Sequence, residues 1–461
     1  MQTEIKHEAE RLADAAKTNL MIEGTIWKQL LLFSIPLILG NLLQQMYNTA
    51  DSIIVGQSVG SNALAAVSAS TSLINLLIAF SQGASVGAGV IVSQYLGARD
   101  REGVHSSVHT ALAIAAILGL ALTGAGIALS RQLLIWMQTP DEVMPDAVLY
   151  LRIYAGALLF NVMYNMLAGI LNAVGNSKRS LIYLAAAAVT NIVLDLVLVC
   201  LFDMGVAGAA IATDMSQMAS CVLALRFLIK VPASYRVSLE KIRICRRDAV
   251  RIIRVGLPTG IQNMVISFSN VLVQSSVNVF GTKAMAGWGA YMKIDGFNIL
   301  PVTSLSMAAT TFTGQNFGAG RLDRVKQGMW VTVLMNLVYT LATGALLLLF
   351  CKPLLQLFNA DPEVISVGAH AMRYFCPFYF LLGVMHALAG TVRGAGKSIP
   401  PMAILLFAMC LFRIFWIQWI VPLFDTIDGV FMLYPVSWLI GLLLMALYAW
   451  RGHWLPSIQT G

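Results

Sequence analysis

Four polar residues in apolar surroundings are the strongest candidates for chemistry in this chain: Asp51, Asn191, Asp195 and Thr213. Each lies in a stretch apolar enough to cross a membrane, where an unpaired charge costs at least ~2.5–3.5 kcal/mol at the bilayer centre. Asn191 and Asp195 are four residues apart and share one helix face. At about 1.5 Å per residue, Asp51, Asp195 and Thr213 lie at one depth, roughly 6–11 Å below the outer membrane boundary.

Two carboxylates, an amide oxygen and a hydroxyl can therefore converge on one point in the membrane. Hard oxygen ligands of this kind suit a small cation, which predicts a possible Na⁺ site at these four residues. Alternatively, repulsion between the two carboxylates lets one of them hold a proton. The structural alternative is a buried ion pair or a carboxylate near the interface. The sequence does not choose between proton and sodium.

Pro36 lies fifteen residues before Asp51 in the same apolar stretch. A proline inside a helix removes a hydrogen bond and clashes with the preceding turn, so it allows the helix to bend. We therefore predict a hinge at Pro36. Polar residues follow it at a spacing of three to four, and they indicate a helix face turned toward a cavity. They are Asn41, Gln44, Gln45, Asn48, Asp51 and Ser52.

A similar polar stripe in the second half of the chain consists of Asn263, Ser267, Asn270, Gln274 and Asn278. The repetition favours a cavity shared by the two halves. We expect substrate contacts from Asn41, Gln44, Asn48, Met292 and Asp295. Methionine thioethers are polarizable and adapt to many shapes, and Asp295 is a candidate contact for cationic substrates. Lys293, two residues earlier, is expected on the opposite side of that helix.

The remaining composition excludes most other classes of protein. The 461 residues are 58% hydrophobic and 11% charged, whereas soluble chains carry roughly 25% charged residues. About twelve apolar stretches can cross a hydrocarbon core, which needs roughly 20 helical residues each. These stretches are too long and uninterrupted for barrel strands. The predicted spans are 30–55, 63–93, 104–129, 148–173, 180–201, 206–230, 250–280, 286–314, 328–350, 364–392, 400–421 and 430–450.

The second half of the chain repeats the first. Pro36 corresponds to Pro258, and Gln94 corresponds to Gln315. Six spans per half leave both halves in the same orientation, so the repeat is parallel and its pseudo-two-fold axis lies along the membrane normal. The predicted fold is an all-α membrane protein of 12 transmembrane helices in two pseudo-symmetric six-helix lobes around a central cleft. The substrate path is expected between the lobes.

The formal net charge of +8 follows from where Lys and Arg fall. With both termini in the cytoplasm, most of them lie in inner loops and tails, as the positive-inside rule requires. We predict a multi-pass protein of the plasma membrane, monomeric and without a nucleic-acid partner. The expected parts are a tail (1–25), an N-lobe (26–230), a basic linker (231–249), a C-lobe (250–450) and a second tail (451–461). No nucleophile–base pair stands out, so neither an enzyme, nor catalytic residues, nor a cofactor beyond the coupling ion is expected.

The chain resembles the multidrug and toxic compound extrusion (MATE) family from Ile26 to Trp450. The resemblance is carried by SIPLILGNLLQQMYNTADSIIVG (34–56), by the paired segments VSQYLGARD (92–100) and TGQNFGAG (313–320), and by Asn191 and Asp195 with Thr213 eighteen residues later. It implies two six-helix lobes around a V-shaped cleft. It also implies that the residues matching Asp51, Asn191, Asp195 and Thr213 form an N-lobe cation site, and that the proline matching Pro36 bends the first helix. The sodium-coupled branch of the family has carboxylates in spans 7 and 10, and this chain has none there.

These observations predict a proton- or sodium-coupled antiporter that exports drug-like or cationic amphiphilic molecules by alternating access. The alternative is a flippase for lipid-linked precursors from the related transporter superfamily. Such flippases commonly need a strongly basic cavity, for which only Lys293 and Arg413 are candidates against several acids. A non-transporting scaffold or receptor has no obvious use for buried carboxylates.

Overall fold

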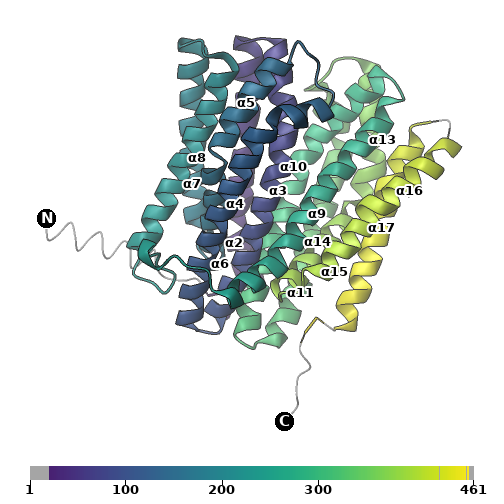
Figure 1. Cartoon of the computed structure of the whole chain (residues 1–461). Helices are drawn as coiled ribbons and strands as arrows, with labels where there is room; N and C mark the ends of the chain where they lie inside the picture. The colour runs from purple at the N-terminus through teal and green to yellow at the C-terminus, as the bar shows by residue number, and fades with distance from the viewer. Residues whose placement is uncertain (1–19, 425, 453, 456–461) are drawn as a thin grey trace. The chain divides into compact units, whose positions relative to one another are not determined.

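The protein is helical throughout most of its length. The computed structural model describes residues 20–424, 426–452 and 454–455, and its described residues form helices, turns and loops with no strand (Figure 1). The elements are α2 (Ile26–Ser58), α3 (Ser61–Gly97), α4 (Arg101–Trp136), α5 (Met144–Gly156), α6 (Leu158–Ala173), α7 (Ser177–Asp195), η1 (Leu196–Leu201), α8 (Gly205–Lys230), η2 (Leu239–Lys241), α9 (Arg246–Asn278), α10 (Thr282–Gly318), α11 (Leu322–Leu349), α12 (Cys351–Gln356), α13 (Pro362–Phe375), η3 (Cys376–Phe378), α14 (Tyr379–Gly394), α15 (Ile399–Leu406), η4 (Phe407–Leu411), α16 (Phe412–Trp419), η5 (Val421–Leu423) and α17 (Asp428–Arg451).

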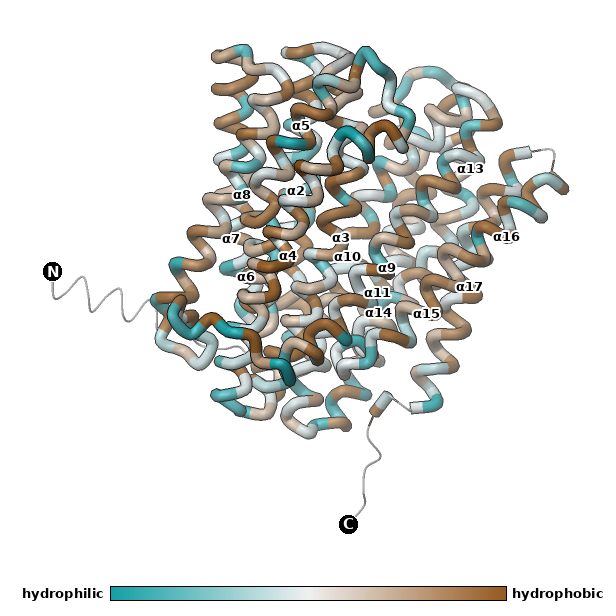
Figure 2. Tube along the Cα trace, in the orientation of Figure 1, coloured by the Kyte–Doolittle hydropathy of each residue, from teal (hydrophilic) through white to brown (hydrophobic). Residues whose placement is uncertain are grey.

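These helices follow the twelve predicted spans in order. Within the described residues, nine helices are long and apolar enough to cross a membrane, and the pair α5 and α6, bent by 49°, would make a tenth. Helices α9 and α10, of 33 and 37 residues, correspond to two further predicted spans but carry more polar residues. Along the helices, hydrophobic residues fill the middle and hydrophilic residues concentrate toward ends and loops (Figure 2).

The chain divides into two compact units. Of the described residues, unit 1 contains Leu20 and residues 35–260, and unit 2 contains residues 21–34 and those from 261 onward. Helix α2 therefore begins in unit 2 and continues in unit 1, whereas α9 begins in unit 1 and continues in unit 2. The N-terminal tail predicted at 1–25 lies largely outside the described residues, as does most of the C-terminal tail at 451–461.

Unit 1 is held together by buried aliphatic side chains and by close helix contacts. Helix α6 packs on α3 and α4, and α7 packs on α8. Gly83 and Gly87 of α3 let the backbone of α9 approach closely. A Cβ atom on Gly87 would lie 2.4 Å from the carbonyl oxygen of Ile252, and one on Gly83 would lie 2.4 Å from the nitrogen of Gly260. Small residues give helices in membranes their packing energy in this way, so larger side chains at Gly83 or Gly87 would force the helices apart.

Unit 2 has an aromatic core. Trp288 of α10 is 1% exposed and stacks on Phe431 of α17 at 5.8 Å between ring centroids. Phe375 of α13 meets the edge of Tyr434 at 5.0 Å, and Trp438 lies one turn further along α17. Edge-to-face and offset ring pairs of this kind add stability beyond the area that they bury. They fix α10, α13 and α17 together around a buried cluster.

Candidate functional site

The predicted ion-coupling residues lie on three helices of unit 1. Asp195 is the last residue of α7 and is fully buried, and Asn191 lies one turn earlier with 1% exposure. Thr213 of α8 is also buried. The Asn191 amide donates a hydrogen bond to the Thr213 hydroxyl at 3.4 Å, and that hydroxyl donates to the Ala209 carbonyl at 3.1 Å. The structure thus brings Asn191 and Thr213 together.

Asp51 of α2 completes this group. It is half-buried and interacts electrostatically with Asp195. Directly after Asp195, the helix changes to a π-helical turn, Leu196–Leu201. Single π-turns inside α-helices are frequent at functional sites. Here the wider turn marks the end of the helix face that carries Asn191 and Asp195.

The side-chain oxygens around these residues lack hydrogen-bond donors. Among the described residues, no group donates to Asp51 Oδ1, to Asn191 Oδ1, to either oxygen of Asp195 or to Gln217 Oε1, all of them buried. Most buried polar atoms in proteins have a partner, so such a concentration requires an explanation. Five acceptors without donors form a place where a bound cation or a proton would satisfy the oxygens.

Further residues lie close to the same acids. Asp214 was noted in the sequence as an acid inside an apolar span but was not assigned to the ion site, and the others were not singled out: Tyr47, Tyr150, Tyr154 and Gln217. The rings of Tyr150 and Tyr154 stack with their centroids 6.3 Å apart. Tyr150 interacts electrostatically with Asp51, Asp195 and Asp214, and Tyr47 of α2 interacts with Asp51 and lies next to Gln217. The sequence contained a signal for some of them, because Gln217 follows Thr213 by four residues and Tyr154 follows Tyr150 by four, so each pair shares a helix face.

Pro36 lies inside α2, which continues as one helix from Ile26 to Ser58. Three of the predicted substrate contacts lie on the same helix. Gln44 and Asn48 are exposed, and Asn41 is half-buried. Their positions on α2 place them between Pro36 and Asp51.

The other predicted substrate contacts lie on α10 in unit 2. Asp295 is half-buried and accepts a hydrogen bond from the Tyr379 hydroxyl at 2.7 Å, and Tyr379 lies 3.0 Å from the Tyr291 hydroxyl. Met292 packs against the aromatic core. Lys293 places its ammonium 5.6 Å from the centre of the Phe358 ring. Asp295 and Lys293 therefore have different neighbours, as their spacing predicted.

Unit 2 also buries a cation. The guanidinium of Arg413 on α16 is 4.4 Å from the centre of the Tyr434 ring and donates to Ser437 Oγ at 3.3 Å. It also donates to Asn270 Oδ1 of α9 at 3.4 Å. A planar guanidinium suits such a buried position because it can stack on a ring and donate in several directions.

Comparison with known proteins shows the family. The chain matches the model of the MatE family twice, over residues 36–197 and 258–417. It belongs to the MatE family. The two matched segments correspond to the two halves of the predicted repeat, and the predicted resemblance to MATE transporters is confirmed. The protein is accordingly a multi-pass membrane transporter of small molecules and not an enzyme.

A probable multidrug resistance protein, YpnP of Bacillus subtilis (strain 168), is 32% identical to the chain over 394 residues. The alignment covers 85% of this chain and 87% of that protein. Two solved structures, of MATE in the bent conformation and of MATE in the straight conformation, each match with a TM-score of 0.88 at 23% identity. They cover 95% of this chain and 97% and 98% of their own chains. These matches confirm the predicted all-α, two-lobed transporter fold.

Proposed function

We propose that this MatE protein is a cation-coupled antiporter, driven by protons or sodium, that exports drug-like or cationic amphiphilic molecules by alternating access. The observation that carries the proposal is the group of five buried acceptor oxygens on Asp51, Asn191, Asp195 and Gln217, for which the described residues supply no donor. The name of the relative YpnP as a probable multidrug resistance protein supports drugs as the substrate class.

The coupling ion would act by binding among these oxygens. Two carboxylates that interact in a membrane are costly while both are charged and unpaired, so a proton or Na⁺ on the site stabilises the arrangement that α2, α7 and α8 adopt around it. Thr213 contributes its hydroxyl through Asn191. An ion that favours one conformation can shift the equilibrium only by its difference in affinity for the two conformations.

Pro36 is proposed as the hinge through which the ion reshapes the substrate cavity. It lies in α2, the helix that also carries Asp51, so binding of a cation at Asp51 would be able to bend or straighten the same helix at Pro36. The existence of bent and straight MATE structures supports such a change in a relative of the same fold. Asn41, Gln44, Asn48, Met292 and Asp295 are the residues that we propose to contact substrate.

The proposal includes a monomer that binds no nucleic acid, and an orientation with both termini in the cytoplasm. The basic linker between α8 and α9 supports this orientation, because positively charged loops stay on the inner side. The orientation can be tested with a variant in which the other five cysteines are replaced and the exposed Cys200 remains. The measurement is whether a membrane-impermeant thiol reagent labels Cys200 in intact cells.

The decisive test uses purified protein in sealed liposomes, with a proton gradient or a sodium gradient imposed separately. Transport of a fluorescent cationic dye should follow one of the gradients in the wild type and neither in Asp195→Asn. Asp203→Asn, in the turn before α8, is the matched control because its carboxylate is exposed. Dye movement that ignores both gradients, or a fully active Asp195→Asn, would refute cation coupling at this site.

A further inference from the structure

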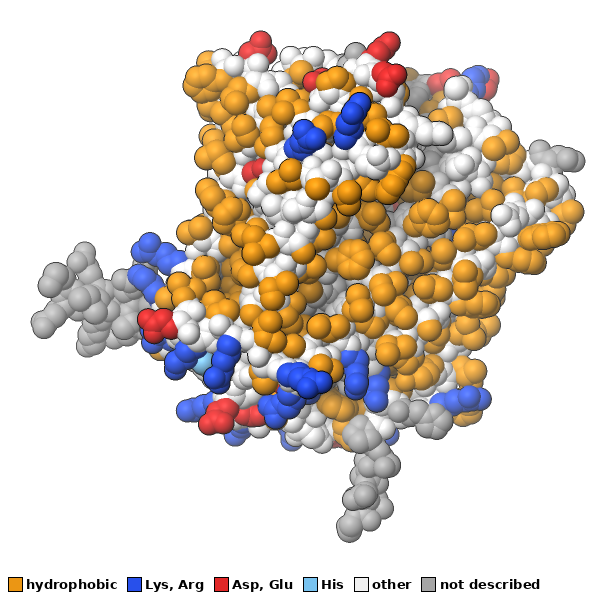
Figure 3. All heavy atoms as spheres, viewed as in Figure 1, with side chains coloured by type: hydrophobic (Ala, Val, Ile, Leu, Met, Phe, Trp, Pro, Cys, Tyr) orange, Lys and Arg blue, Asp and Glu red, His pale blue; other side chains and the backbone are white. Residues whose placement is uncertain are grey.

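A cavity of about 1700 Å³ opens in unit 1 at the ends of its membrane-crossing helices, remote in sequence from Asp51 and Asp195. Its wall is formed by the end of α3, the start of α4, the linker between α8 and α9, and the first turn of α9. In Figure 3, Lys and Arg side chains gather at this end, next to the apolar side chains that cover the helices. The six cations that line the cavity are Arg99, Arg101, Arg236, Lys241, Arg243 and Arg247.

The cations outnumber the acids that could neutralise them. The cavity is also lined by Asp100, Glu102 and Glu240, and one oxygen of Asp100 accepts from the backbone nitrogen of Gly103 at 2.9 Å. Within the part of the chain that the structure describes, the side chains of four cations make no ion pair or hydrogen bond, and their charges remain available to a ligand. They are Arg99, Arg101, Lys241 and Arg243.

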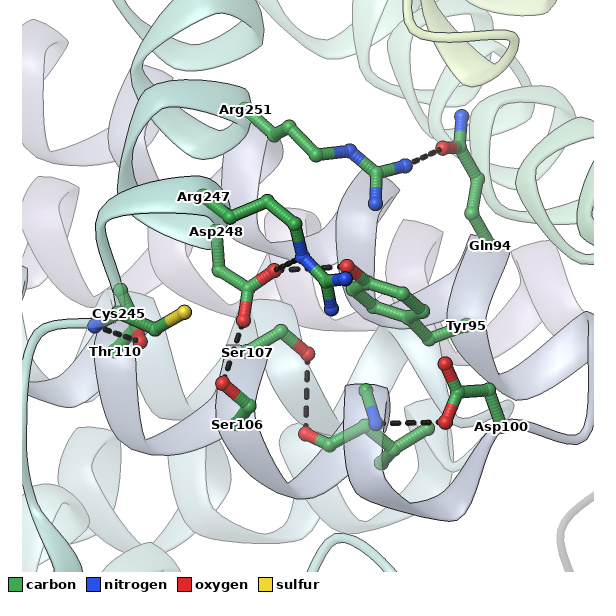
Figure 4. A network of polar contacts seen from close by, with 12 residues as sticks. Gln94, Tyr95, Asp100, Ser106, Ser107, Thr110, Cys245, Arg247, Asp248 and Arg251 are labelled. Atoms are coloured by element: carbon green, nitrogen blue, oxygen red, sulfur yellow. Dashed lines mark hydrogen bonds and ion pairs between the residues drawn. The ribbon is translucent and has the colours of Figure 1, made fainter.

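Arg247 and Arg251, by contrast, are engaged at the first turns of α9. Figure 4 shows Asp248, which is fully buried, pointing between α3 and α4, where it accepts from the Tyr95 hydroxyl at 2.8 Å and from Ser106 Oγ at 2.6 Å. Arg247 Nε lies 3.6 Å from Asp248, and Arg251 donates to Gln94 Oε1 at 3.0 Å. These contacts fix Arg247 and Arg251, and Arg236 donates to the Ile229 carbonyl at 3.0 Å, so the other four cations are the ones left for a ligand.

The linker that carries Arg236, Lys241 and Arg243 has a defined structure. Val237 is buried and hydrogen-bonds through its backbone nitrogen to Leu228 O at 2.9 Å. His109 of α4 accepts from the backbone nitrogen of Ser238 at 3.0 Å, and Thr110 accepts from that of Cys245 at 3.1 Å. Because the linker is hydrogen-bonded to α4 at its middle and at the end that precedes α9, its cations are presented at fixed positions.

The same linker exposes apolar side chains between its cations. Leu239 is 58% exposed, Ile242 is 37% exposed and Ile244 is 51% exposed, and they flank Lys241 and Arg243 in the sequence. A soluble anion would make no contact with these apolar side chains. A phospholipid would contact both kinds of side chain, because apolar residues enter the membrane interface while neighbouring Lys and Arg contact anionic headgroups.

The corresponding end of unit 2 uses its cations differently. Arg321 donates to the Ile22 carbonyl at 2.8 Å, and Arg324 donates to the Gly24 carbonyl at 3.1 Å. Arg324 also reaches Asn316 Oδ1 at 3.1 Å. Arg321 and Arg324 are thus occupied by oxygen atoms of the chain itself, whereas Arg99, Arg101, Lys241 and Arg243 of unit 1 line an open cavity.

We propose that this cavity binds the phosphate headgroup of an anionic glycerophospholipid from the adjacent leaflet. The headgroup would lie among Arg99, Arg101, Lys241 and Arg243, and the acyl chains would run along Leu239 and Ile244 into the bilayer. The site is separate from the proposed ion and substrate sites, and it does not depend on whether the protein exports drugs.

The test measures binding of dioctanoyl phosphatidylglycerol to the purified full-length protein in uncharged detergent, by calorimetry. Dioctanoyl phosphatidylcholine and glycerol 3-phosphate are the comparison ligands. Phosphatidylglycerol should bind at least about tenfold more tightly than phosphatidylcholine, and Lys241→Gln/Arg243→Gln should remove roughly tenfold of that affinity. Lys326→Gln/Lys397→Gln, which removes two exposed cations of unit 2, should change nothing.

Two further variants separate lipid from soluble anion and guard against misfolding. Leu239→Ser/Ile244→Ser should weaken phosphatidylglycerol and leave glycerol 3-phosphate unchanged. Arg99→Asn/Arg101→Gln should repeat the loss caused by the linker variant, and Asn suits the left-handed backbone of Arg99, whose φ is 57°. Glycerol 3-phosphate binding as tightly as the lipid would overturn the lipid assignment. The site would be refuted if Lys326→Gln/Lys397→Gln lost as much affinity for phosphatidylglycerol as Lys241→Gln/Arg243→Gln. It would also be refuted if the wild type bound phosphatidylglycerol no more tightly than phosphatidylcholine.

Discussion

The buried acids of the two units differ in their partners. In unit 1, neither oxygen of Asp195 receives a hydrogen bond from the described residues, and Asp51 and Asp195 repel each other. In unit 2, Asp295 is held by the Tyr379 hydroxyl at 2.7 Å, which is itself in contact with Tyr291. Asp295 thus has a hydrogen-bond donor within its own unit, whereas Asp195 has none among the described residues. This difference is the reason why we propose the ion site in unit 1.

The spans that correspond in the repeat also differ in charge. Helix α7 of unit 1 carries Asn191 and Asp195, while its counterpart in unit 2, α15 to α16, carries the buried Arg413 and no acid. Arg413 has two oxygen acceptors and a ring face for its charge. The corresponding helices of the two units thus carry buried charged residues of opposite sign.

The largest effect should come from Asp195→Asn. The change preserves volume and removes the charge that has no partner, so coupling to the ion should be lost while the protein remains folded. We expect gradient-driven efflux to fall by roughly 100-fold, near the upper end of measured coupling free energies. The measurement is dye efflux from proteoliposomes, with elution from size exclusion as the check on folding. Full efflux by this variant would refute the assignment of the ion site to unit 1.

Asp51→Asn should also reduce gradient-driven efflux, but by less than Asp195→Asn. Asp51 is half-buried, and only one of its oxygens is both buried and without a donor, whereas both oxygens of Asp195 are, so the charge of Asp51 is less dependent on the bound ion. We expect roughly a tenfold loss of coupled efflux. If Asp51→Asn proved more damaging than Asp195→Asn in the same assay, the ranking of the two acids by burial would be wrong.

Pro36→Ala tests the hinge rather than the charges. Alanine restores the backbone donor and favours a straight helix, so the transition between conformations should slow while substrate binding survives. A loss of about fivefold in efflux rate with unchanged affinity for the dye is the expected pattern. The matched control is Pro258→Ala in α9, the counterpart in the repeat, which has no carboxylate further along its helix. Wild-type turnover in Pro36→Ala would argue for a static bend.

Arg413→Met tests whether the buried cation of unit 2 has a structural role only. The variant keeps the volume of the side chain but leaves Ser437, Asn270 and the Tyr434 ring without their cation. Truncating one partner of a buried hydrogen-bonded group costs about 1–3 kcal/mol, so thermal unfolding should occur at a lower temperature. The choice of coupling ion should not change. A switch between proton and sodium dependence in this variant would mean that unit 2 takes part in coupling.

Asp295→Asn should have the smallest effect. Asparagine can still accept the hydrogen bond from Tyr379 through its amide oxygen, so stability should change by about 1 kcal/mol or less. Affinity for cationic dyes should fall a few-fold, and affinity for neutral substrates of similar size should not. Tyr379→Phe is the companion variant, because it removes the donor and leaves the acid. Equal losses for charged and neutral substrates would exclude a charge-based role for Asp295.

Much of the fold could be predicted from the sequence, because hydropathy over about 20 residues determines which segments can cross a membrane. The repeated residues around Pro36 and Pro258 also identified two equivalent halves. The sequence did not predict that α2 and α9 would each be divided between the units. Such a division depends on where the backbones approach, as Gly83 and Gly87 allow, and no hydropathy pattern contains that information.

The candidate site was only partly predictable. The pairing of Asn191 with Thr213 follows from depth and helix periodicity, and the structure places their side chains together. The tyrosines Tyr47, Tyr150 and Tyr154 were missed, because an aromatic residue in an apolar span is indistinguishable from core packing until its neighbours are known. That Asp295 would receive a hydrogen bond from Tyr379 was equally hidden, since the two are far apart in the sequence. The roles of all these residues in transport stay predictions.

The division of α2 and α9 between the units has a consequence for how the protein is synthesised. Met21–Ser34 belongs to unit 2, yet the ribosome makes it before any residue of Ile261–Gly461. At translation rates of about 5–20 residues per second, that segment waits roughly 10–50 s before the rest of its unit begins to be made. Unit 1, in turn, is complete only once Gly260 has been made. A chain cut in the linker, before α9, would therefore yield two fragments of which neither contains all the residues of one compact unit, so the two halves would have to be produced together to fold.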